Sequence, residues 1–366
     1  MDKRIQIAAI VLTITFSVLV MTSPNDPIPL PKPTINSQSD FVTILAENLD
    51  KPRAIAVADN RIFVTEKDGS IRVVQDGVLL DSNLASFRSV DVFDAGLLGI
   101  AVHPDFSDNH FLYVFLTYED KDEKLWNKIL RITENENKLK TVETIFDNIP
   151  GSSFTNGGFL KFGPDEKLYV GTGTVSDSSH LPQDLNSLSG KILRLNDDGT
   201  IPSDNPFAES PVYSLGHRHP QGMTWDDEGT MFVAEFGPDK NDEINIIQAG
   251  KNYGWPEHQC SEGSNDGFEE SLLCYDPSIE PGGILFYSGD KLDFESPFIM
   301  ASMRAINLYQ VDFEEGLSSQ KSILSGVGRI RDVVQGDDGS LYVITSNTDG
   351  KGFPDRTDDK LVRILQ

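Results

Sequence analysis

Two arginine-containing segments offer the clearest chemistry in the sequence. In the first, Arg218 stands between His217 and His219, so that a guanidinium and two imidazoles follow one another between Gly216 and Gly222. A guanidinium presents a planar fork of N–H donors, which suits an anion or a carbonyl oxygen. A solvated surface loop is the alternative. The segment predicts a ligand-binding site that includes Arg218 and His219.

A second pair of arginines occurs near the end of the chain. Arg329 and Arg331 are two residues apart in a stretch that reads as a strand, where side chains alternate between two faces. Both guanidiniums therefore lie on one face. In a chain with 31 basic and 57 acidic side chains, two cations on one face favour an anionic ligand. A pair of surface ion bridges is the alternative.

The segment from 235 to 256 is rich in oxygen ligands. It offers backbone carbonyls and carboxylates together, a mixture that suits Ca²⁺ far better than zinc or copper. Its spacing differs from that of an EF-hand. The residues that we expect to hold the metal are Gly237, Pro238, Asp242, Glu243 and Tyr253.

Two glycine-containing loops occur once each. Thr155 and Asn156 precede Gly157 and Gly158, directly before a strand that belongs to a repeated pattern, and a unique loop beside a repeated strand suggests a site. Asp94 precedes Gly96 and Gly99. These two glycines either shape a site or only let neighbouring strands approach closely.

A repeated unit must position these loops. A turn rich in Asp, Asn, Gly or Pro, followed by a short β-branched or aromatic strand, occurs six times, with strands at 62–64, 112–114, 168–170, 231–233, 298–300 and 341–343. Each is followed by a further strand, at 70–74, 128–132, 191–195, 243–247, 307–311 and 360–364. The pattern predicts an all-β, six-bladed β-propeller with four-stranded antiparallel blades. Residues 41–45 would complete the blade that ends at 360–365 and so close the ring. A pair of β-sandwiches is the alternative.

Charge and cysteine content limit the partners and the compartment. The net charge of −26 repels phosphate backbones, so nucleic acid is excluded as an expected partner. The two cysteines, Cys260 and Cys274, lie in one polar loop and either form a disulfide in an oxidising compartment or stay free.

The first 39 residues read as export and linker segments. Basic residues precede an apolar run at 5–21, so we expect residues 1–22 to be a signal peptide or a membrane anchor, with a buried helix as the alternative. Prolines at 24, 27, 29, 31 and 33 indicate an extended linker over 23–39. The propeller domain then spans 40–366. The protein is expected outside the cytoplasm, secreted or tethered to the outer face of the cytoplasmic membrane.

Six segments together resemble the soluble glucose/sorbosone (aldose sugar) dehydrogenase family, six-bladed propellers that use pyrroloquinoline quinone (PQQ) and calcium. The segments begin at Gly96 (GLLGIAVHPDF), Asn156 (NGGFLKFGPDEKLYVGTG), Gln183 (QDLNSLSGKILRLNDDGTIPSDNPF), Gly216 (GHRHPQG), Glu235 (EFGPDKNDEINIIQAGKNYGWP) and Gly328 (GRIRDVVQGDDGSLYVIT). They cover residues 41–366 in the order found in the family. The resemblance implies oxidation of an aldose to its lactone, with a sugar substrate and an electron acceptor as partners.

The resemblance also implies roles for individual residues. Arg218 would polarise the quinone carbonyls, and Arg329 and Arg331 would bind the PQQ carboxylates. Arg304 matches a position where the family has a lysine facing the cofactor. The carbonyls of Gly237 and Pro238 would bind the calcium ion at the cofactor, and Glu243 and Tyr253 fit a structural calcium site.

Four positions depart from the family, and one of them is Thr174, which follows Gly173 where the family has an acidic residue. Thr155 stands where the family has the histidine that removes the proton of the sugar's anomeric hydroxyl, and a threonine hydroxyl cannot act as a base near neutral pH. Asp94 stands where the family has Gln or Glu, and His219 where it has Asn. His219 or His180 would then have to act as the base, or the proton would leave through water.

These departures leave three hypotheses for the function. The first is a PQQ-dependent dehydrogenase with a replaced base. The second is a propeller that binds sugar, PQQ or another ligand at the cell surface without turnover. The third is a calcium-dependent lactonase-like propeller, although the loops lack the acid cluster that such a site needs.

Overall fold

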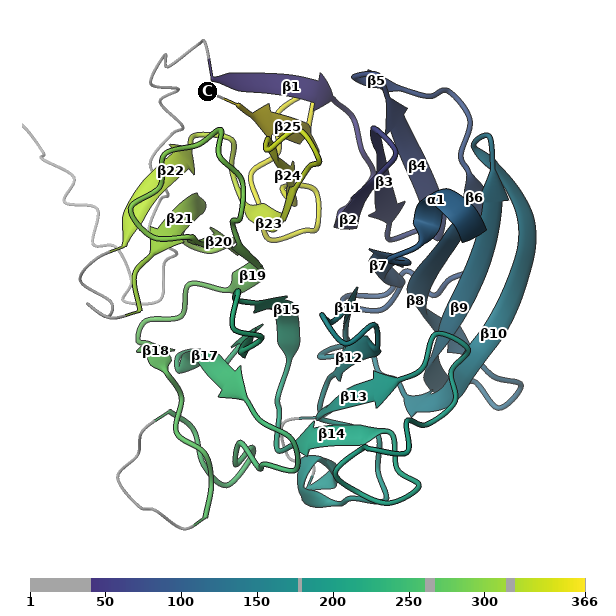
Figure 1. The fold of residues 1–366 in the computed structure, drawn as a ribbon, viewed down its shortest axis with the longest axis vertical. Helices are drawn as coiled ribbons and strands as arrows, with labels where there is room; N and C mark the ends of the chain where they lie inside the picture. The colour runs from purple at the N-terminus through teal and green to yellow at the C-terminus, as the bar shows by residue number, and fades with distance from the viewer. Residues whose placement is uncertain (1–40, 177–179, 261–266, 314–319, 366) are drawn as a thin grey trace, which may run out of the picture. The chain divides into compact units, whose positions relative to one another are not determined.

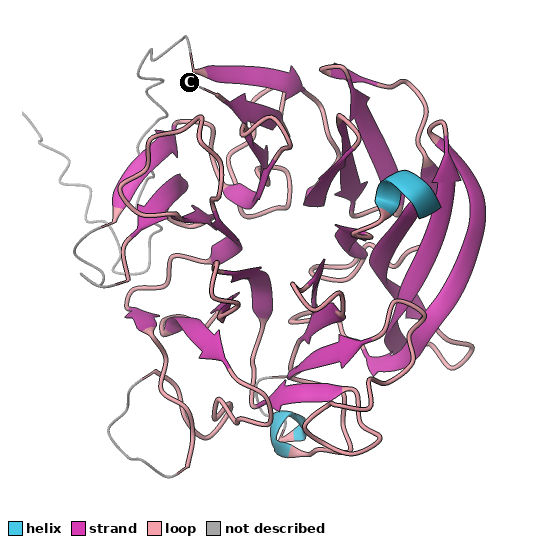
Figure 2. Cartoon of the chain, viewed as in Figure 1, coloured by secondary structure: helices cyan, strands magenta, loops and turns pink. Residues whose placement is uncertain are grey.

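The computed structural model describes residues 41–365, except 177–179, 261–266 and 314–319. These residues form twenty-five β-strands, one short helix α1 (Phe106–Asn109) and the 3-10 helix η1 (Leu181–Gln183) (Figure 2). The predictions for residues 1–22 and 23–39 lie outside the described residues. Among the described helices, neither is long and apolar enough to cross a membrane.

The strands form six antiparallel sheets arranged around a central axis (Figure 1). The first sheet contains β2 (Pro52–Ala58), β3 (Arg61–Glu66), β4 (Ser70–Gln75) and β5 (Val78–Leu79), and β6 (Ala85–Ser86) also pairs with β4. The second and third contain β7 (Leu97–Val102), β8 (Phe111–Glu119), β9 (Leu125–Asn135) and β10 (Lys138–Pro150), then β11 (Gly157–Phe162), β12 (Leu168–Thr172), β13 (Lys191–Leu195) and β14 (Val212–Leu215). The fourth and fifth contain β15 (Pro220–Trp225), β16 (Met231–Glu235), β17 (Asp242–Ile247) and β18 (Leu273–Tyr275), then β19 (Pro281–Phe286), β20 (Phe298–Ser302), β21 (Asn307–Val311) and β22 (Lys321–Ser325).

The sixth sheet joins the two ends of the described chain. It contains β23 (Ile330–Gln335), β24 (Leu341–Thr345) and β25 (Leu361–Ile364), and its outer strand is β1 (Val42–Ala46). β1 pairs with β25 in antiparallel register, with Val42 opposite Ile364. The sheet therefore closes the ring and removes a free edge, as the sequence predicted. The predicted six-bladed propeller is confirmed, and the alternative pair of β-sandwiches is wrong.

The repeated sequence unit is the second strand of each blade. The six predicted strands lie in β3, β8, β12, β16, β20 and β24, and the six strands predicted to follow them lie in β4, β9, β13, β17, β21 and β25. Three of the turns that precede the second strands share one hydrogen-bond pattern. An aspartate side chain accepts the N–H two residues further on, as in Asp338 with Ser340 (3.0 Å) and Asp165 with Lys167 (3.2 Å).

The innermost strands pack against one another in the order β2, β7, β11, β15, β19, β23 and back to β2. The apolar core lies between neighbouring blades: Phe63 of β3 packs with Leu112 of β8, and Phe115 of β8 with Val170 of β12. Gly99 allows β7 and β11 to approach closely, since a Cβ atom there would lie 2.2 Å from the carbonyl oxygen of Gly158. For Gly99, strand packing is therefore a sufficient explanation.

Cys260 and Cys274 form a disulfide with a Cα–Cα distance of 5.6 Å. Cys274 lies in β18 opposite Glu243 of β17, and the N–H of Cys260 donates to Glu243 Oε1 at 2.5 Å. Of the two alternatives that the sequence left open, the structure contains the disulfide, which ties the polar loop to the Glu243 strand.

Candidate functional site

The predicted site residues lie at the beginnings of inner strands. Asp94 precedes β7, Thr155 precedes β11, Arg218 and His219 precede β15, and Arg329 and Arg331 flank the first residue of β23. The inner strands occupy equivalent positions in successive blades. Their beginnings therefore meet at one end of the central axis, which brings together loops that are far apart in the sequence (Figure 1).

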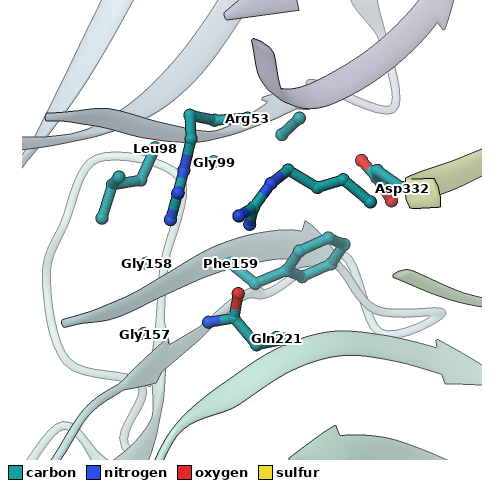
Figure 3. Close-up of a pocket in the computed structure, with 10 residues that line it drawn as sticks. Arg53, Leu98, Gly99, Gly157, Gly158, Phe159, Gln221 and Asp332 are labelled. Carbon is teal, nitrogen blue, oxygen red and sulfur yellow. The ribbon is translucent and has the colours of Figure 1, made fainter. Parts of the chain in front are cut away.

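A small cavity of about 20 Å³ lies among these strands. Figure 3 shows the side chain of Arg53 reaching into it beside Leu98, with Gly157, Gly158, Phe159 and Gln221 around it. Arg331 and Asp332 of β23 also line the cavity. Burial, and then the positive charge of Arg53, lower the pKa of Arg331 to about 9. Two guanidiniums, those of Arg53 and Arg331, therefore line the cavity. In the described part of the chain, the carboxylate nearest to Arg331 is 3.9 Å away.

Arg329 and Arg331 share partners, which confirms that their side chains lie on one face of β23. Arg329 donates to Glu280 Oε2 and Asp349 Oδ2, both at 3.1 Å. Arg331 donates to Ser346 Oγ at 3.2 Å, and its Nη2 lies 3.9 Å from Asp349 Oδ2. Both arginines are buried, so the alternative of surface ion bridges is wrong. Arg329 has two close carboxylates, whereas Arg331 has one distant carboxylate.

Thr155 occupies a constrained loop. Its φ of 53° is unusual for a β-branched residue, and its buried hydroxyl has no hydrogen-bond partner among the described residues. Asn156 anchors the loop, since its side chain accepts from the N–H of Ser152 at 2.9 Å and donates to the carbonyl of Ser152 at 2.7 Å. Gly173 leaves room for the loop, because a Cβ atom there would lie 1.7 Å from the carbonyl oxygen of Thr155.

His219 is held by the same loop. Its Nδ1 accepts a hydrogen bond from the N–H of Gly157 at 3.2 Å, which places the proton of the neutral ring on Nε2. Burial lowers the pKa of His219 to about 3, and the attraction of Asp94 does not offset burial. The ring is therefore neutral near pH 7, and its only basic nitrogen is already engaged. This geometry makes His219 a poor proton acceptor.

Asp94 lies on the loop beside Thr155. Its N–H donates to the carbonyl of Ser153 at 2.8 Å, and the exposed rings of Phe93 and Phe154 stack 4.3 Å apart, which joins the two loops. Burial acts to raise the pKa of Asp94, but the protonated form of His219 and the charges of Arg53, Lys351 and Arg331 outweigh it and lower the pKa to about 2. Asp94 is therefore an ionised carboxylate at the site.

Arg218 lines a second, smaller cavity of about 10 Å³, together with Glu235, Gly237, Glu243 and Trp255. Its Nη1 donates to the carbonyls of Phe236 (3.0 Å) and Gly237 (2.7 Å), and its guanidinium carbon lies 5.3 Å from the centre of the Trp255 ring. These contacts fix the direction of the guanidinium.

His217 points away from its two neighbours. It is fully buried, contacts Glu235 Oε1 at 2.9 Å and Ser214 Oγ at 2.8 Å, and stacks on Tyr253. His217 therefore turns into the blade and lines neither of the two cavities.

The residues predicted to hold calcium divide into two groups. Glu243 and Glu235 both accept from Asn245 Nδ2 at 3.0 Å, and burial, followed by the charge of Glu235, raises the pKa of Glu243. Asp242 instead accepts four hydrogen bonds, from the N–H groups of Gly237, Ile279 and Glu280 and from Ser278 Oγ, at 2.7–2.8 Å. Its carboxylate ties the backbone at Gly237 to the segment 278–280.

The Tyr253 hydroxyl donates to the carbonyl of Ile246 at 2.6 Å. Over the described ranges, no three Asp, Glu, His or Cys side chains gather into a metal cluster.

Two other predicted residues lie at the margin. Arg304 is half exposed and donates to Glu280 Oε1 at 3.1 Å, which connects it to Arg329 through one carboxylate. His180 is largely exposed beside η1, with its Nδ1 3.9 Å from Glu257 Oε1. It does not line the cavity that contains Arg53 and Arg331.

Several residues of the site were missed in the sequence, namely Arg53, Glu235, Glu280 and Asp349. The signal for Arg53 was present, because it is the only charged residue of the otherwise apolar stretch 52–58. The partners Glu280 and Asp349 carry no such signal, since acidic residues are common throughout this chain.

Comparison with known proteins agrees with this architecture. The family described as Glucose / Sorbosone dehydrogenase matches residues 49–362. Aldose sugar dehydrogenase YliI of Escherichia coli is 30% identical over 338 residues, which cover 85% of this chain and 91% of the relative. The PQQ-bound aldose sugar dehydrogenase of Streptomyces coelicolor superposes with a TM-score of 0.78 at 34% identity and covers 88% of this chain and 97% of its own. A Thermus oxidoreductase described as a glucose dehydrogenase gives 0.79 at 34% identity, covering 88% and 99%. The chain therefore belongs to the glucose/sorbosone dehydrogenase family.

Proposed function

We propose that this protein is a PQQ-dependent dehydrogenase that oxidises an aldose sugar to its lactone outside the cytoplasm. The observation that carries the proposal is the position of Arg218, Arg329 and Arg331 at the same end of the inner strands as the Thr155 loop. The PQQ-bound relative from Streptomyces and the aldose dehydrogenase from Escherichia coli support the assignment.

The arginines fit a polycarboxylate cofactor. Burial without a close carboxylate lowers the pKa of Arg331 to about 9, and a bound carboxylate would supply the missing negative charge. Arg329 and Arg331 would hold carboxylates of PQQ, with Arg304 at the rim. Arg218, fixed by two backbone carbonyls, would hold a quinone oxygen. When bound, PQQ supplies the acceptor for the two electrons and the hydrogen that leave the sugar carbon.

Calcium fits the buried carboxylates of the second cavity. Glu235 and Glu243 both accept a hydrogen bond from the side-chain amide of Asn245, and burial, followed by the charge of Glu235, raises the pKa of Glu243. A bound cation would offset both effects. The carbonyls of Gly237 and Pro238 remain the proposed ligands of the calcium ion at the cofactor, and Tyr253 remains a proposed ligand, with Glu243, of the structural calcium ion. Asp242 is less suited to direct contact, because both of its oxygens already accept hydrogen bonds.

Removal of the hydroxyl proton is the weak step of this site. Thr155 cannot accept a proton, Nδ1 of His219 is engaged by Gly157, and Asp94 is ionised but has a pKa of only about 2. We therefore expect turnover to be slow, with the proton passing to Asp94 or to water. The same observations favour the second candidate function, a propeller that binds PQQ or sugar without turnover. The described residues offer no acid cluster for the lactonase-like alternative.

Reconstitution separates these candidates. The full chain is titrated with PQQ in the presence of Ca²⁺, and binding is followed by calorimetry while dye reduction is measured with a panel of aldoses. A methyl glycoside, which lacks the anomeric hydroxyl, is the substrate control. Turnover of aldoses but not of the glycoside supports the dehydrogenase. PQQ binding without turnover supports the binding propeller. Absence of PQQ binding to wild type contradicts the PQQ-dependent dehydrogenase and leaves only a propeller that binds sugar or another ligand.

We also propose that the protein is exported and stays tethered through residues 5–21. The disulfide between Cys260 and Cys274 supports an oxidising compartment. Fractionation of cells that express the full chain tests the tether: the protein is expected in the membrane fraction, and a variant lacking residues 1–39 in the soluble fraction. Recovery of the full-length protein in the cytoplasm would contradict export.

A further inference from the structure

Arg53 is a buried cation that lines the cavity described above. Its side chain lies on the inner strand β2, and the residue is 8% exposed. In the part of the chain that the structure describes, its guanidinium makes no hydrogen bond and no ion pair. Burial lowers its pKa, against the more distant attraction of Asp94, Asp349 and Asp91. The ionised Asp94 attracts Arg53 but makes no hydrogen bond with it. A buried guanidinium without a hydrogen-bonded partner is costly, so a residue of this kind needs an explanation.

The buried arginines of the same blade usually have partners. Arg61 of β3 is equally buried, at 8% exposure, but its Nη1 lies 2.9 Å from Glu134 Oε1 and 3.2 Å from Asn137 Oδ1. The described part of the chain therefore pairs Arg61 and offers Arg53 no hydrogen bond or ion pair. This contrast indicates that the partner of Arg53 comes from outside the chain.

Arg53 shares its cavity with Arg331. The positive charge of Arg53 is the second cause, after burial, of the lowered pKa of Arg331, so the two guanidiniums repel each other. Asp332, the acid that lines the same cavity, does not neutralise them well. Its oxygens accept from the N–H groups of Ile55 (3.0 Å) and Val333 (2.8 Å), and burial raises its pKa to about 7.

The shape of the cavity restricts the ligand. Its volume of about 20 Å³ suits a small charged group better than a whole sugar or quinone ring. Gly99, Gly157 and Gly158 line it without side chains, so a ligand can approach the backbone. Two planar forks of N–H donors suit the two oxygens of a carboxylate.

We propose that Arg53 and Arg331 together bind one carboxylate at this end of the central axis. The proposal deepens the proposed function and rests on it for the identity of the ligand. The carboxylate has two sources: it belongs to the cofactor, or it belongs to an acidic sugar such as a uronic acid. In the first case Arg53 is a further cofactor residue, and in the second it sets the specificity for charged aldoses.

Two variants and one control test the pair. Arg53→Gln removes the charge, Arg53→Lys keeps the charge but not the fork, and Arg61→Gln removes a buried arginine that has internal partners. Without ligand, we expect Arg53→Gln to unfold at the same temperature as wild type or higher, because repulsion is relieved. Arg61→Gln is expected to unfold at a lower temperature, since it leaves Glu134 unpaired.

Binding then identifies the source of the carboxylate. If it belongs to the cofactor, Arg53→Gln weakens the affinity for PQQ by about 10- to 100-fold, and Arg53→Lys by less. If it belongs to the sugar, the affinity for PQQ is unchanged. Glucuronate then raises the unfolding temperature of wild type but not of Arg53→Gln, and glucose raises the unfolding temperature of neither. If wild type binds glucuronate but not PQQ, the proposed function is refuted, whereas the proposal that Arg53 and Arg331 bind a carboxylate is supported. The pair is refuted if Arg53→Gln binds PQQ and glucuronate within two-fold of wild type, or if wild type binds neither.

Discussion

The backbone N–H of Gly157 donates a hydrogen bond to Nδ1 of His219 across 3.2 Å. These residues belong to neighbouring blades and are 62 positions apart in the sequence. The contact links two of the departures from the family. Gly157 lies two residues after Thr155, which stands at the position of the family's catalytic histidine, and His219 was the first candidate to replace that histidine. The bond occupies the nitrogen that His219 would need as a base.

Replacing Thr155 with histidine should restore a base. Histidine tolerates the φ of 53° at this position better than a β-branched residue does, so the loop is expected to keep its shape. If proton removal limits turnover, Thr155→His raises kcat by about 10²- to 10⁴-fold, as expected for a general base. The measurement is steady-state dye reduction with the PQQ-loaded enzyme.

Thr155→Asn is the matched control for this variant, since asparagine also accepts a positive φ but supplies no base. Equal rates for the two variants would show that proton removal is not the missing function. A rise in kcat for histidine alone would favour the dehydrogenase over the binding propeller.

The buried carboxylate of Asp332 should make stability depend on pH. Its pKa is about 7 in the folded protein, against an ordinary value of 3.8, because burial outweighs its two hydrogen bonds. The folded state therefore holds the proton more tightly than the unfolded state, and stability is lost as pH rises from about 4 to about 7. The loss should be roughly 2–4 kcal/mol. Urea unfolding at a series of pH values measures it.

Asp332→Asn isolates this effect from other ionisable groups. The difference in unfolding free energy between wild type and variant should shift in favour of the variant as pH rises through this range. A difference that stays constant from pH 4 to pH 8 would contradict the raised pKa.

Lys191 should be essential for stability although it lies outside the site. Its side chain is fully buried, and Nζ donates to the carbonyls of Leu181 (2.9 Å), Pro182 (2.9 Å) and Ser189 (2.7 Å). Lys191→Met leaves these carbonyls without their donor and should cost about 2–4 kcal/mol of unfolding free energy. Lys321→Met, at an exposed position of β22, should change it by less than about 0.5 kcal/mol. Similar losses for the two variants would contradict the role of Lys191.

Reduction of the disulfide should destabilise the loop at Glu243. The bond closes a loop between residues 14 apart, for which the chain-entropy model gives about 3 kcal/mol. Thermal unfolding with and without a thiol reductant should show a lower midpoint in the reductant. The double variant Cys260→Ser and Cys274→Ser should already unfold at the lower temperature and should not respond to the reductant. A midpoint that the reductant does not change in wild type would argue against the bond.

The sequence by itself determined the architecture, because the information is local and repeated. Each blade carries its own turn, such as the one at Asp165, followed by the strand of Leu168 to Val170, and these signals need no knowledge of distant residues. Ring closure by residues 41–45 followed from the same repeat. The family's arginines could also be recognised, since Arg218, Arg329 and Arg331 lie in segments with a fixed local order.

Only the tertiary structure decided how these residues meet. The contact between Gly157 and His219, the meeting of Arg53 with Arg331 in one cavity and the turning of His217 into the blade all depend on which inner strands become neighbours in the ring. Such contacts join residues that are tens to hundreds of positions apart. The sequence alone does not show whether a charged residue such as Arg53 will have a partner. Its low-dielectric surroundings and its distance from acidic side chains arise only when the blades pack around it.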